Sequence, residues 1–233
     1  MNLGIMKRRA AQNTKANPYI TDGLIAMFDA EWNLGLGKHD GNLATWNDIT
    51  NMSFNGGFDG SGYIWGSNFL QLNNTSFNFI HLNLLQYLID DSLSVELIYK
   101  PLSASSGTYH DVIMINPSTT RGFWVYGNST YSINNIFYRS RGASPTTSYL
   151  SGRWSDQELK KISLYGTKFV DGENEITLNS GGTTYLGTNI IGFNRNKNSK
   201  LNLYCIRIYN KVLSQAEITH NALIDKKRFG LNI

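Results

Sequence analysis

The sequence predicts an all-β protein, a two-sheet antiparallel jelly-roll sandwich that ends in one short helix. The 233-residue chain has many short apolar stretches separated by turn residues, and no helical stretches alternate with them. Gly, Asn, Ser, Thr and aromatic residues are plentiful, which favours strands and turns. The length suits one β domain, and we expect about 14 strands or fewer.

In the first half of the chain, the turn signal Asp22-Gly23 opens a strand over 23–30, and a long loop runs to about residue 44. Shorter strand-like stretches follow at 45–50 and 62–73. The segment 78–91 fits neither the strand nor the helix period cleanly. The strand over 93–101 is clearer, and Pro101 predicts its exit because proline cannot donate to a ladder.

In the second half of the chain, the stretches 110–116, 122–127 and 133–140 predict a meander of short strands. Two further strands over 159–166 and 167–170 lead to the turn pair Asp171-Gly172, and 173–178 completes that hairpin. The stretches 188–194 and 201–210 are the last two predicted strands.

One C-terminal helix has a complete set of start and stop signals. Ser214 and Glu217 form a capping box, and Leu213 and Ile218 occupy the positions of a hydrophobic staple. Gly230 is suited to end the helix. Cations that suit the C-terminal end of the helix dipole occupy the last turn, namely Lys226, Lys227 and Arg228. These signals predict a structural helix that packs back on the sandwich.

The positive charge of the chain lies in a predicted N-terminal arm, residues 1–18. Its basic residues are Lys7, Arg8, Arg9 and Lys15. Removing those four from the 21 basic residues leaves 17, which equals the 17 acidic residues. A neutral body without a basic stripe is unsuited to nucleic acid. The arm lacks the apolar region of a signal peptide, and it is either a flexible tail or an assembly arm that orders on docking.

Two further features limit the class of protein. No apolar run approaches membrane-spanning length, so we expect no membrane insertion. Cys205 is the single cysteine, which excludes an intrachain disulfide, and its apolar neighbours indicate a small core side chain.

The final segment, LNLYCIRIYNKVLSQAEITHNALIDKKRFG, resembles the close of the laminin-G-like (concanavalin A-like) jelly-roll domains of bacteria and their phages. The residues that carry the likeness are Arg207, Tyr209, Leu213, Ser214, Glu217 and Ile218. The opening strand, the Trp-x-Asp element at Trp46 and Asp48, the strand over 93–101 and the hairpin over 167–176 are also similar. The likeness runs from about residue 19 to the C-terminus, the expected extent of the domain (19–233).

The resemblance implies a non-enzymatic recognition module that binds a carbohydrate or cell surface and works in a phage virion or bacterial surface assembly. Its partners would be a glycan or cell-surface receptor, other virion or surface-assembly proteins, and a further copy of the chain in a homo-oligomer. The expected location is the virion or the extracellular surface. The alternative is a purely structural virion protein, a decoration, fibre or tail component, that its N-terminal arm anchors.

The same fold also hosts glycoside hydrolases, which need a pair of carboxylates. Asp171, Glu173 and Glu175 have the alternate spacing of one strand face, but the Asp-Gly pair predicts a bend that turns all three acids toward solvent. Glu96 is the one acid within the central strand, and no second carboxylate lies two residues away. We therefore expect Glu96 to be a hydrogen-bonded structural residue and the chain to be no enzyme.

Other catalytic patterns are missing. The glycine-rich segment 35–41 lacks the Lys-Ser/Thr ending of a phosphate loop, and no helix pattern follows it. No Gly-x-Ser-x-Gly elbow is present. The four histidines, His39, His81, His110 and His220, have no metal-ligand spacing.

Calcium is the one cofactor that the acidic residues of the first loop could bind, and some members of the resembled family hold calcium. Asp29, Glu31, Asp40 and Asp48 surround the first long loop, and calcium takes several oxygens from flexible loops. Their spacing is not that of a regular calcium loop. Such side chains also commonly hydrogen-bond their own backbone, so both interpretations stand.

The candidate ligand surface is a set of aromatic and polar side chains, because sugar rings stack on aromatic rings while hydroxyls pair with polar groups. The candidates are Arg121, Trp124, Tyr126, Asn128, Asn194 and Arg195, with Trp32 as a separate position. Trp124 and Tyr126 lie two residues apart on one strand face, which is also typical of core or cross-strand packing.

Overall fold

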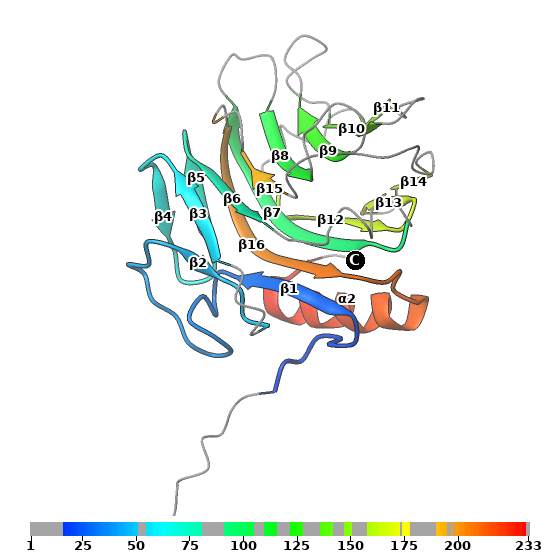
Figure 1. Cartoon of the computed structure of the whole chain (residues 1–233), viewed down its shortest axis with the longest axis horizontal. Helices are drawn as coiled ribbons and strands as arrows, with labels where there is room; N and C mark the ends of the chain where they lie inside the picture. Colours follow the sequence, from blue (N-terminus) through cyan, green and yellow to red (C-terminus); the bar gives the residue numbers. More distant parts are fainter. Residues whose placement is uncertain are drawn as a thin grey trace, which may run out of the picture.

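The computed structural model describes residues 16–50, 55–80, 91–104, 110–115, 122–127, 136–141, 147–150, 158–172, 174–177, 190–194, 197 and 199–231. These residues form two antiparallel sheets and one C-terminal helix, which confirms the predicted fold class (Figure 1). The predicted arm falls mostly on residues 1–15, which lie outside this description, and stays a prediction.

The helix-side sheet is the one that the helix covers. Its strands have the order β14-β13-β12-β7-β16-β5-β4, and β1 also pairs with β16. The bounds are β1 (Leu24–Asp29), β4 (Tyr63–Trp65), β5 (Leu70–Asn73), β7 (Ser94–Ala104), β12 (Lys160–Tyr165), β13 (Lys168–Asp171), β14 (Asn174–Thr177) and β16 (Ser199–Tyr209). The two 11-residue strands, β7 and β16, lie side by side at its centre.

The second sheet has the order β11-β10-β9-β8-β15-β6-β3-β2. Its bounds are β2 (Trp46–Asn47), β3 (Asn55–Asp59), β6 (Ser76–Ile80), β8 (His110–Ile115), β9 (Gly122–Gly127), β10 (Ile136–Arg141), β11 (Thr147–Leu150) and β15 (Ile190–Phe193). The neighbouring strands β8, β9 and β10 are the predicted meander.

Two details differ from the sequence predictions, and one segment stays undecided. The described residues contain sixteen strands, more than the expected limit, because β3 and β11 are too short to show an apolar period. Pro101 does not end its strand; it lies inside β7, opposite Leu201 and beside a register shift, where a missing N–H donor is tolerated. The ambiguous segment 78–91 begins in β6, and residues 81–90 lie outside the description.

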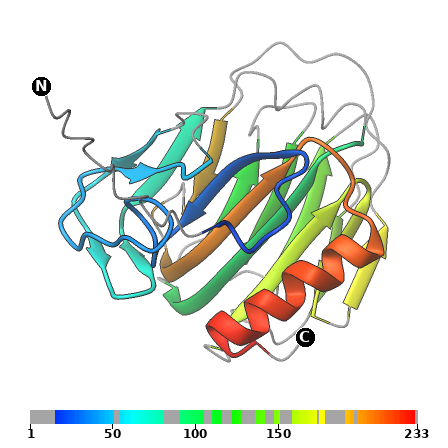
Figure 2. The same ribbon diagram turned by 90° about the horizontal axis from the view of Figure 1, so that it is seen from below.

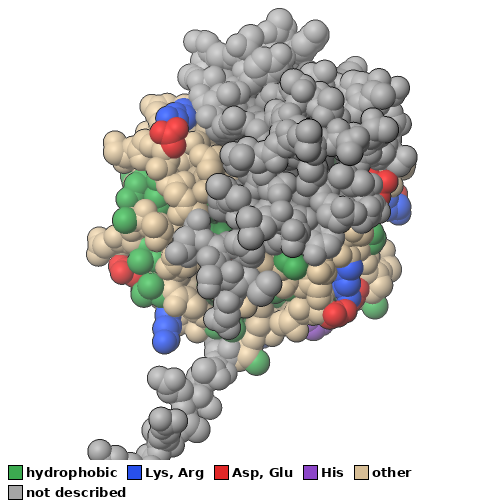
Figure 3. Space-filling view, in the orientation of Figure 1, with side chains coloured by type: hydrophobic (Ala, Val, Ile, Leu, Met, Phe, Trp, Pro, Cys, Tyr) green, Lys and Arg blue, Asp and Glu red, His purple; other side chains and the backbone are tan. Residues whose placement is uncertain are grey.

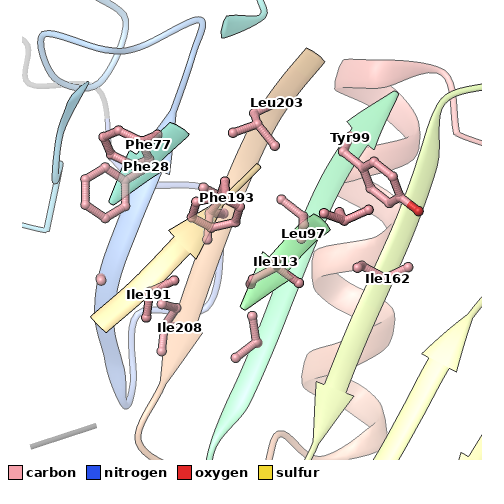
Figure 4. Close-up of a cluster of buried hydrophobic side chains, with 14 of the residues drawn as sticks. Phe28, Phe77, Leu97, Tyr99, Ile113, Ile162, Ile191, Phe193, Leu203 and Ile208 are labelled. Carbon is pink, nitrogen blue, oxygen red and sulfur yellow. The ribbon is translucent and has the colours of Figure 1, made fainter. Parts of the chain in front are cut away.

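The main core lies between the two sheets (Figure 4). Leu97 and Ile208 face it from the helix-side sheet, and Ile113 and Ile191 face it from the second sheet. At one end, Trp46 is fully buried with its ring 5.7 Å from Phe28 and 5.2 Å from Phe77. The Trp-x-Asp element therefore contributes a core anchor, and the alternating apolar positions of the strands face inward.

The helix, α2 (Gln215–Phe229), has the caps that the sequence predicts. The Ser214 hydroxyl accepts a hydrogen bond from the Glu217 backbone N–H, and Glu217 Oε2 accepts one from the Ser214 backbone N–H at 2.8 Å. Leu213 and Ile218 belong to one apolar cluster, as the staple requires. Gly230 ends the helix with φ 70°, a left-handed conformation that glycine adopts without strain.

We expect Ser214→Ala to lower the free energy of unfolding by about 1 kcal/mol, because it removes the side-chain acceptor of the helix start. Urea unfolding followed by circular dichroism measures the change. Ser214→Asp keeps an acceptor and is the matched control, expected to stay within a few tenths of the wild-type value. Equal losses in both variants would contradict a capping role.

Candidate functional site

The candidate site is built on a cluster of buried charges between α2 and the helix-side sheet. Arg207 of β16 lies between two carboxylates, Glu96 of β7 and Asp225 of α2, and Lys161 of β12 completes the cluster. All four side chains are at least nine-tenths buried. Two cations and two anions are thus removed from water together, so their charges balance.

Every carboxylate oxygen of this cluster accepts hydrogen bonds. Arg207 donates to Asp225 from both terminal nitrogens, at 2.8 and 2.6 Å, and to Glu96 from Nε at 2.9 Å. Lys161 Nζ lies 2.8 Å from Asp225 and 2.7 Å from Glu96. Asn221 of α2 donates to Glu96 at 2.8 Å. Bidentate, charge-assisted bonds of this kind define one orientation of the helix on the sheet.

The protonation state of Glu96 follows from the same contacts. Burial by itself would raise the pKa of this carboxyl, but the neighbouring charges of Arg207 and Lys161 outweigh burial and lower the pKa to about 2. Tyr165, whose hydroxyl donates to Glu96 at 2.9 Å, is kept neutral because burial raises its pKa. Glu96 is therefore an ionised structural residue, as its isolated position in the strand predicts.

A second set of contacts ties the last turn of α2 to the start of the domain. Arg228 binds Asp29 through two nitrogens at 2.7 and 3.0 Å and donates to Glu31 at 2.6 Å. Its guanidinium lies 3.6 Å from the centre of the Trp32 ring. It also donates to the Tyr19 hydroxyl at 3.0 Å. Polar contacts thus hold the C-terminal half of α2, from Asn221 to Arg228, to the sandwich.

These contacts give α2 an unusual distribution of side chains. Asn221 and Asp225 are fully buried against the sheet, while Leu223 is 64% exposed. A surface helix normally buries its apolar stripe and exposes its polar face. Here two polar side chains are buried on the inner face beside the half-buried Ile224, and Leu223 remains on the outer flank.

A groove of about 640 Å³ runs between this flank and the outer face of β12, β13 and β14. Figure 2 shows the helix lying over the outer face of the sheet, with these strands beside it. From the strands and the hairpin turn, the lining residues are Lys161, Ser163, Tyr165, Lys168, Val170, Gly172 and Glu175. From α2 and the turn before it they are Val212, Leu213, Gln215, Ile218, Thr219, Ala222, Leu223 and Lys226. The volume is that of a ligand-binding cleft.

The charges of the groove are unevenly compensated. Lys161 is neutralised by the buried cluster below it. Lys168 pairs with Glu175 across the hairpin at 2.9 Å, with both side chains about half exposed. Lys226 lies at the C-terminal end of the helix and is exposed. On the face in Figure 3, the visible charges of the described residues are scattered and form no basic stripe.

Three of the predicted site residues, Trp32, Asp29 and Glu31, lie close together. All three contact Arg228 of the helix. Trp32 is only 4% exposed and its ring is covered by that guanidinium, so it offers no open surface for a sugar. Asp29 is fully buried, and Arg228 occupies both its oxygens. This placement assigns all three residues a structural role.

The other two calcium candidates bind backbone and a neighbouring hydroxyl. Asp48 accepts from the Met27 N–H at 2.9 Å and from Thr50, which ties the first loop to β1. Asp40 accepts from the Asn42 N–H at 2.9 Å, a local loop contact. Among the described residues, no group of three or more His, Cys, Asp or Glu side chains is placed to hold a metal ion.

The candidate aromatic surface is only partly described. Trp124 and Tyr126 lie in β9, where Trp124 is opposite Met114 and Arg139, but their side chains, with Arg121, Asn128 and Arg195, lie outside the described part. Asn194 is fully buried with φ 48°. Its amide donates to the carbonyls of Thr75 and Ser199, so it closes a turn and does not reach the surface.

The hairpin acids are also placed differently from the prediction. Asp171 pairs with Asn174 across a tight turn, as Asp-Gly predicts, but its side chain is 1% exposed and does not point to solvent. Only Glu175 lines the groove, and Glu173 lies outside the described residues. Sequence reasoning missed the groove itself; its one available signal was an aliphatic Leu223 among the polar residues of the final helix.

Several solved structures share this fold. The binding domain of botulinum neurotoxin DC in complex with SialylT is similar with a TM-score of 0.60 at 12% identity, over 87% of this chain and 52% of that chain. The same binding domain in complex with rat synaptotagmin II has a TM-score of 0.62 at 11% identity, over 89% and 52%. A third similar structure is of botulinum neurotoxin type C, whose cell entry depends on interaction with two ganglioside molecules. It has a TM-score of 0.60 at 11% identity, over 86% of this chain and 51% of that chain.

These likenesses establish the β-sandwich fold of binding domains. The chain spans about half the length of the structures it matches. No protein-family model matches the sequence, and no curated protein matches it. Within the described residues, no helix is long and apolar enough to cross a membrane.

The lowered pKa of Glu96 predicts a specific acid response. A carboxyl whose folded pKa is about 2 against an ordinary value of 4.5 adds stability above pH 4.5, and this stability is lost as the pH falls toward 2. We expect Glu96→Gln to flatten the dependence of unfolding free energy on pH in that window. We also expect a loss of about 3–5 kcal/mol at pH 7, because Arg207 and Lys161 keep one counter-charge fewer.

Urea titrations between pH 2 and pH 7 measure this dependence. The exposed Glu175→Gln is the matched control, and its slope should follow the wild type. Parallel wild-type and Glu96→Gln curves below pH 4.5 would show that Glu96 is not the titrating group.

Proposed function

We propose that this chain is a non-catalytic recognition module that binds a carbohydrate or a cell-surface receptor within a phage virion or a bacterial surface assembly. The observation that carries the proposal is the open groove of about 640 Å³ between α2 and β12–β14, formed on a sandwich that shares its fold with receptor-binding domains. The virion or extracellular surface setting follows the laminin-G-like resemblance of residues 201–230.

A binding role suits the chemistry of the groove better than a hydrolase does. Among its lining residues Glu175 is the one carboxylate, and it pairs with Lys168. Glu96 and Asp225 lie below the groove, where they are fully buried in the ion cluster. Glycoside hydrolysis needs two carboxyl groups that reach the substrate. The described residues of the groove do not supply this pair.

The structural alternative has one favourable observation. The chain enters the domain along α2: the His220 Nε2 donates to the Pro18 carbonyl at 2.8 Å, and the Ile20 N–H donates to Asn221 at 3.1 Å. An arm that emerges from such a clamped start is suited to tether the domain to an assembly. Deletion of residues 1–15 should then abolish incorporation into assembled particles and leave ligand binding by the isolated protein intact.

The recognition proposal predicts saturable binding of the full chain to at least one glycan on an array or to an intact cell surface. We expect Leu223→Asp to weaken this binding at least tenfold, because it places a charge on the apolar rim of the groove. Ile64→Asp changes an equally exposed apolar side chain on β4 and is the matched control, expected to bind as wild type.

Trp124→Ala is tested in parallel. A loss in Trp124→Ala with wild-type binding in Leu223→Asp would move the binding surface to the second sheet and leave recognition intact. No binding to any glycan or cell surface would overturn the proposed function.

A further inference from the structure

The helix wall of the groove carries exposed apolar side chains on a side where a surface helix normally has polar residues. The described residues include four large hydrophobic side chains that are well exposed, and two of them, Val212 and Leu223, border this groove. Ile218 and Ala222, both half-buried, line the groove between them. Contiguous exposed apolar surface, rimmed by polar residues, is typical of an interaction site.

The lining favours aliphatic groups over sugar rings. Among the lining residues the one aromatic ring is that of Tyr165, which is 6% exposed and has its hydroxyl committed to Glu96. A pyranose ring would find no open aromatic face on which to stack. Branched aliphatic side chains, by contrast, would remove Val212, Ile218 and Leu223 from water.

The charge of the groove selects an acidic partner. Lys161 is neutralised from below, and Lys168 already has Glu175 as a partner. The exposed Lys226 lines the far end of the groove, and no acid among the described residues forms an ion pair with it there. A carboxylate on the ligand would therefore be placed best at the Lys226 end.

The length of the groove sets the size of the ligand. Gln215 and Lys226 mark its two ends along α2, and eleven helical steps span about 16 Å. An extended peptide covers this distance in about five residues. Its alternate side chains point to the same face, so the first, third and fifth would enter the groove.

We propose that this groove binds an extended segment of a partner protein that presents two aliphatic side chains and then a carboxylate at alternate positions. The aliphatic side chains lie against Val212 and Leu223, at the turn before α2 and on α2 itself, and the carboxylate meets Lys226. This inference rests on the proposed function, because it names the chemistry of the surface receptor or assembly protein that the module would recognise.

The test uses the full chain and fluorescein-labelled peptides with the core Leu-Ser-Leu-Ser-Glu, in both chain directions, measured by fluorescence anisotropy. Matched peptides replace the terminal Glu by Lys or both Leu residues by Ser. We expect the Glu peptide to bind at least tenfold more tightly than either. Leu223→Asp should weaken it at least tenfold, and Lys226→Glu should reverse the preference toward the Lys peptide.

Two variants serve as controls, and thermal unfolding verifies that every variant is folded. Lys227→Glu changes the neighbouring charge outside the groove lining, and Ile64→Asp changes an exposed apolar residue elsewhere; both should keep the wild-type preference. Equal binding of the Glu and Lys peptides, no binding of any peptide, or no reversal in Lys226→Glu would overturn the inference. If peptides fail while glycan or cell binding persists in Leu223→Asp, the inference falls and the recognition function stands.

Discussion

The placement of α2 depends on one interaction, the double contact of Arg207 with Glu96 and Asp225 beneath the helix. A buried charge that loses its partner is far more costly than an ordinary lost contact. A shift of α2 by one turn would separate Asp225 from Arg207 and Lys161 and leave these two cations with Glu96 as their remaining partner. The cluster therefore selects one position of the helix more than it adds to total stability, since a well-packed apolar replacement can be as stable as a buried ion pair.

The groove is a consequence of this position of α2. A helix that docks through Asn221 and Asp225 uses much of its inner face for polar contacts. Ile224 also packs inward, while Leu223 stays exposed beside the strands. In the last turn of the helix, Arg228 makes similar polar contacts with Asp29 and Glu31 and lies over the ring of Trp32. The C-terminal half of this groove wall is thus held in place by polar contacts, which favours a preformed site with little ordering cost on binding.

Local signals explain why much of the fold was predictable. The capping box at Ser214, the left-handed Gly230 and the Asp-Gly hairpin depend on neighbours within a few residues, and all three are confirmed. Trp32 and Asp29 were predicted as possible binding residues. Local spacing could not show that Arg228, about 200 residues away in the sequence, contacts both of them. Long-range pairs of this kind leave no trace in local spacing.

By itself, the sequence determined the β class, the capped C-terminal helix, the neutral body and the structural role of the isolated Glu96, because composition, period and capping act locally. The tertiary structure decided which polar residues meet across strands, which acids are neutralised and which aliphatic side chains stay outside. Burial and ion pairing are properties of surfaces brought together by folding, and the groove beside α2 exists only once β12, β13, β14 and the helix occupy their places.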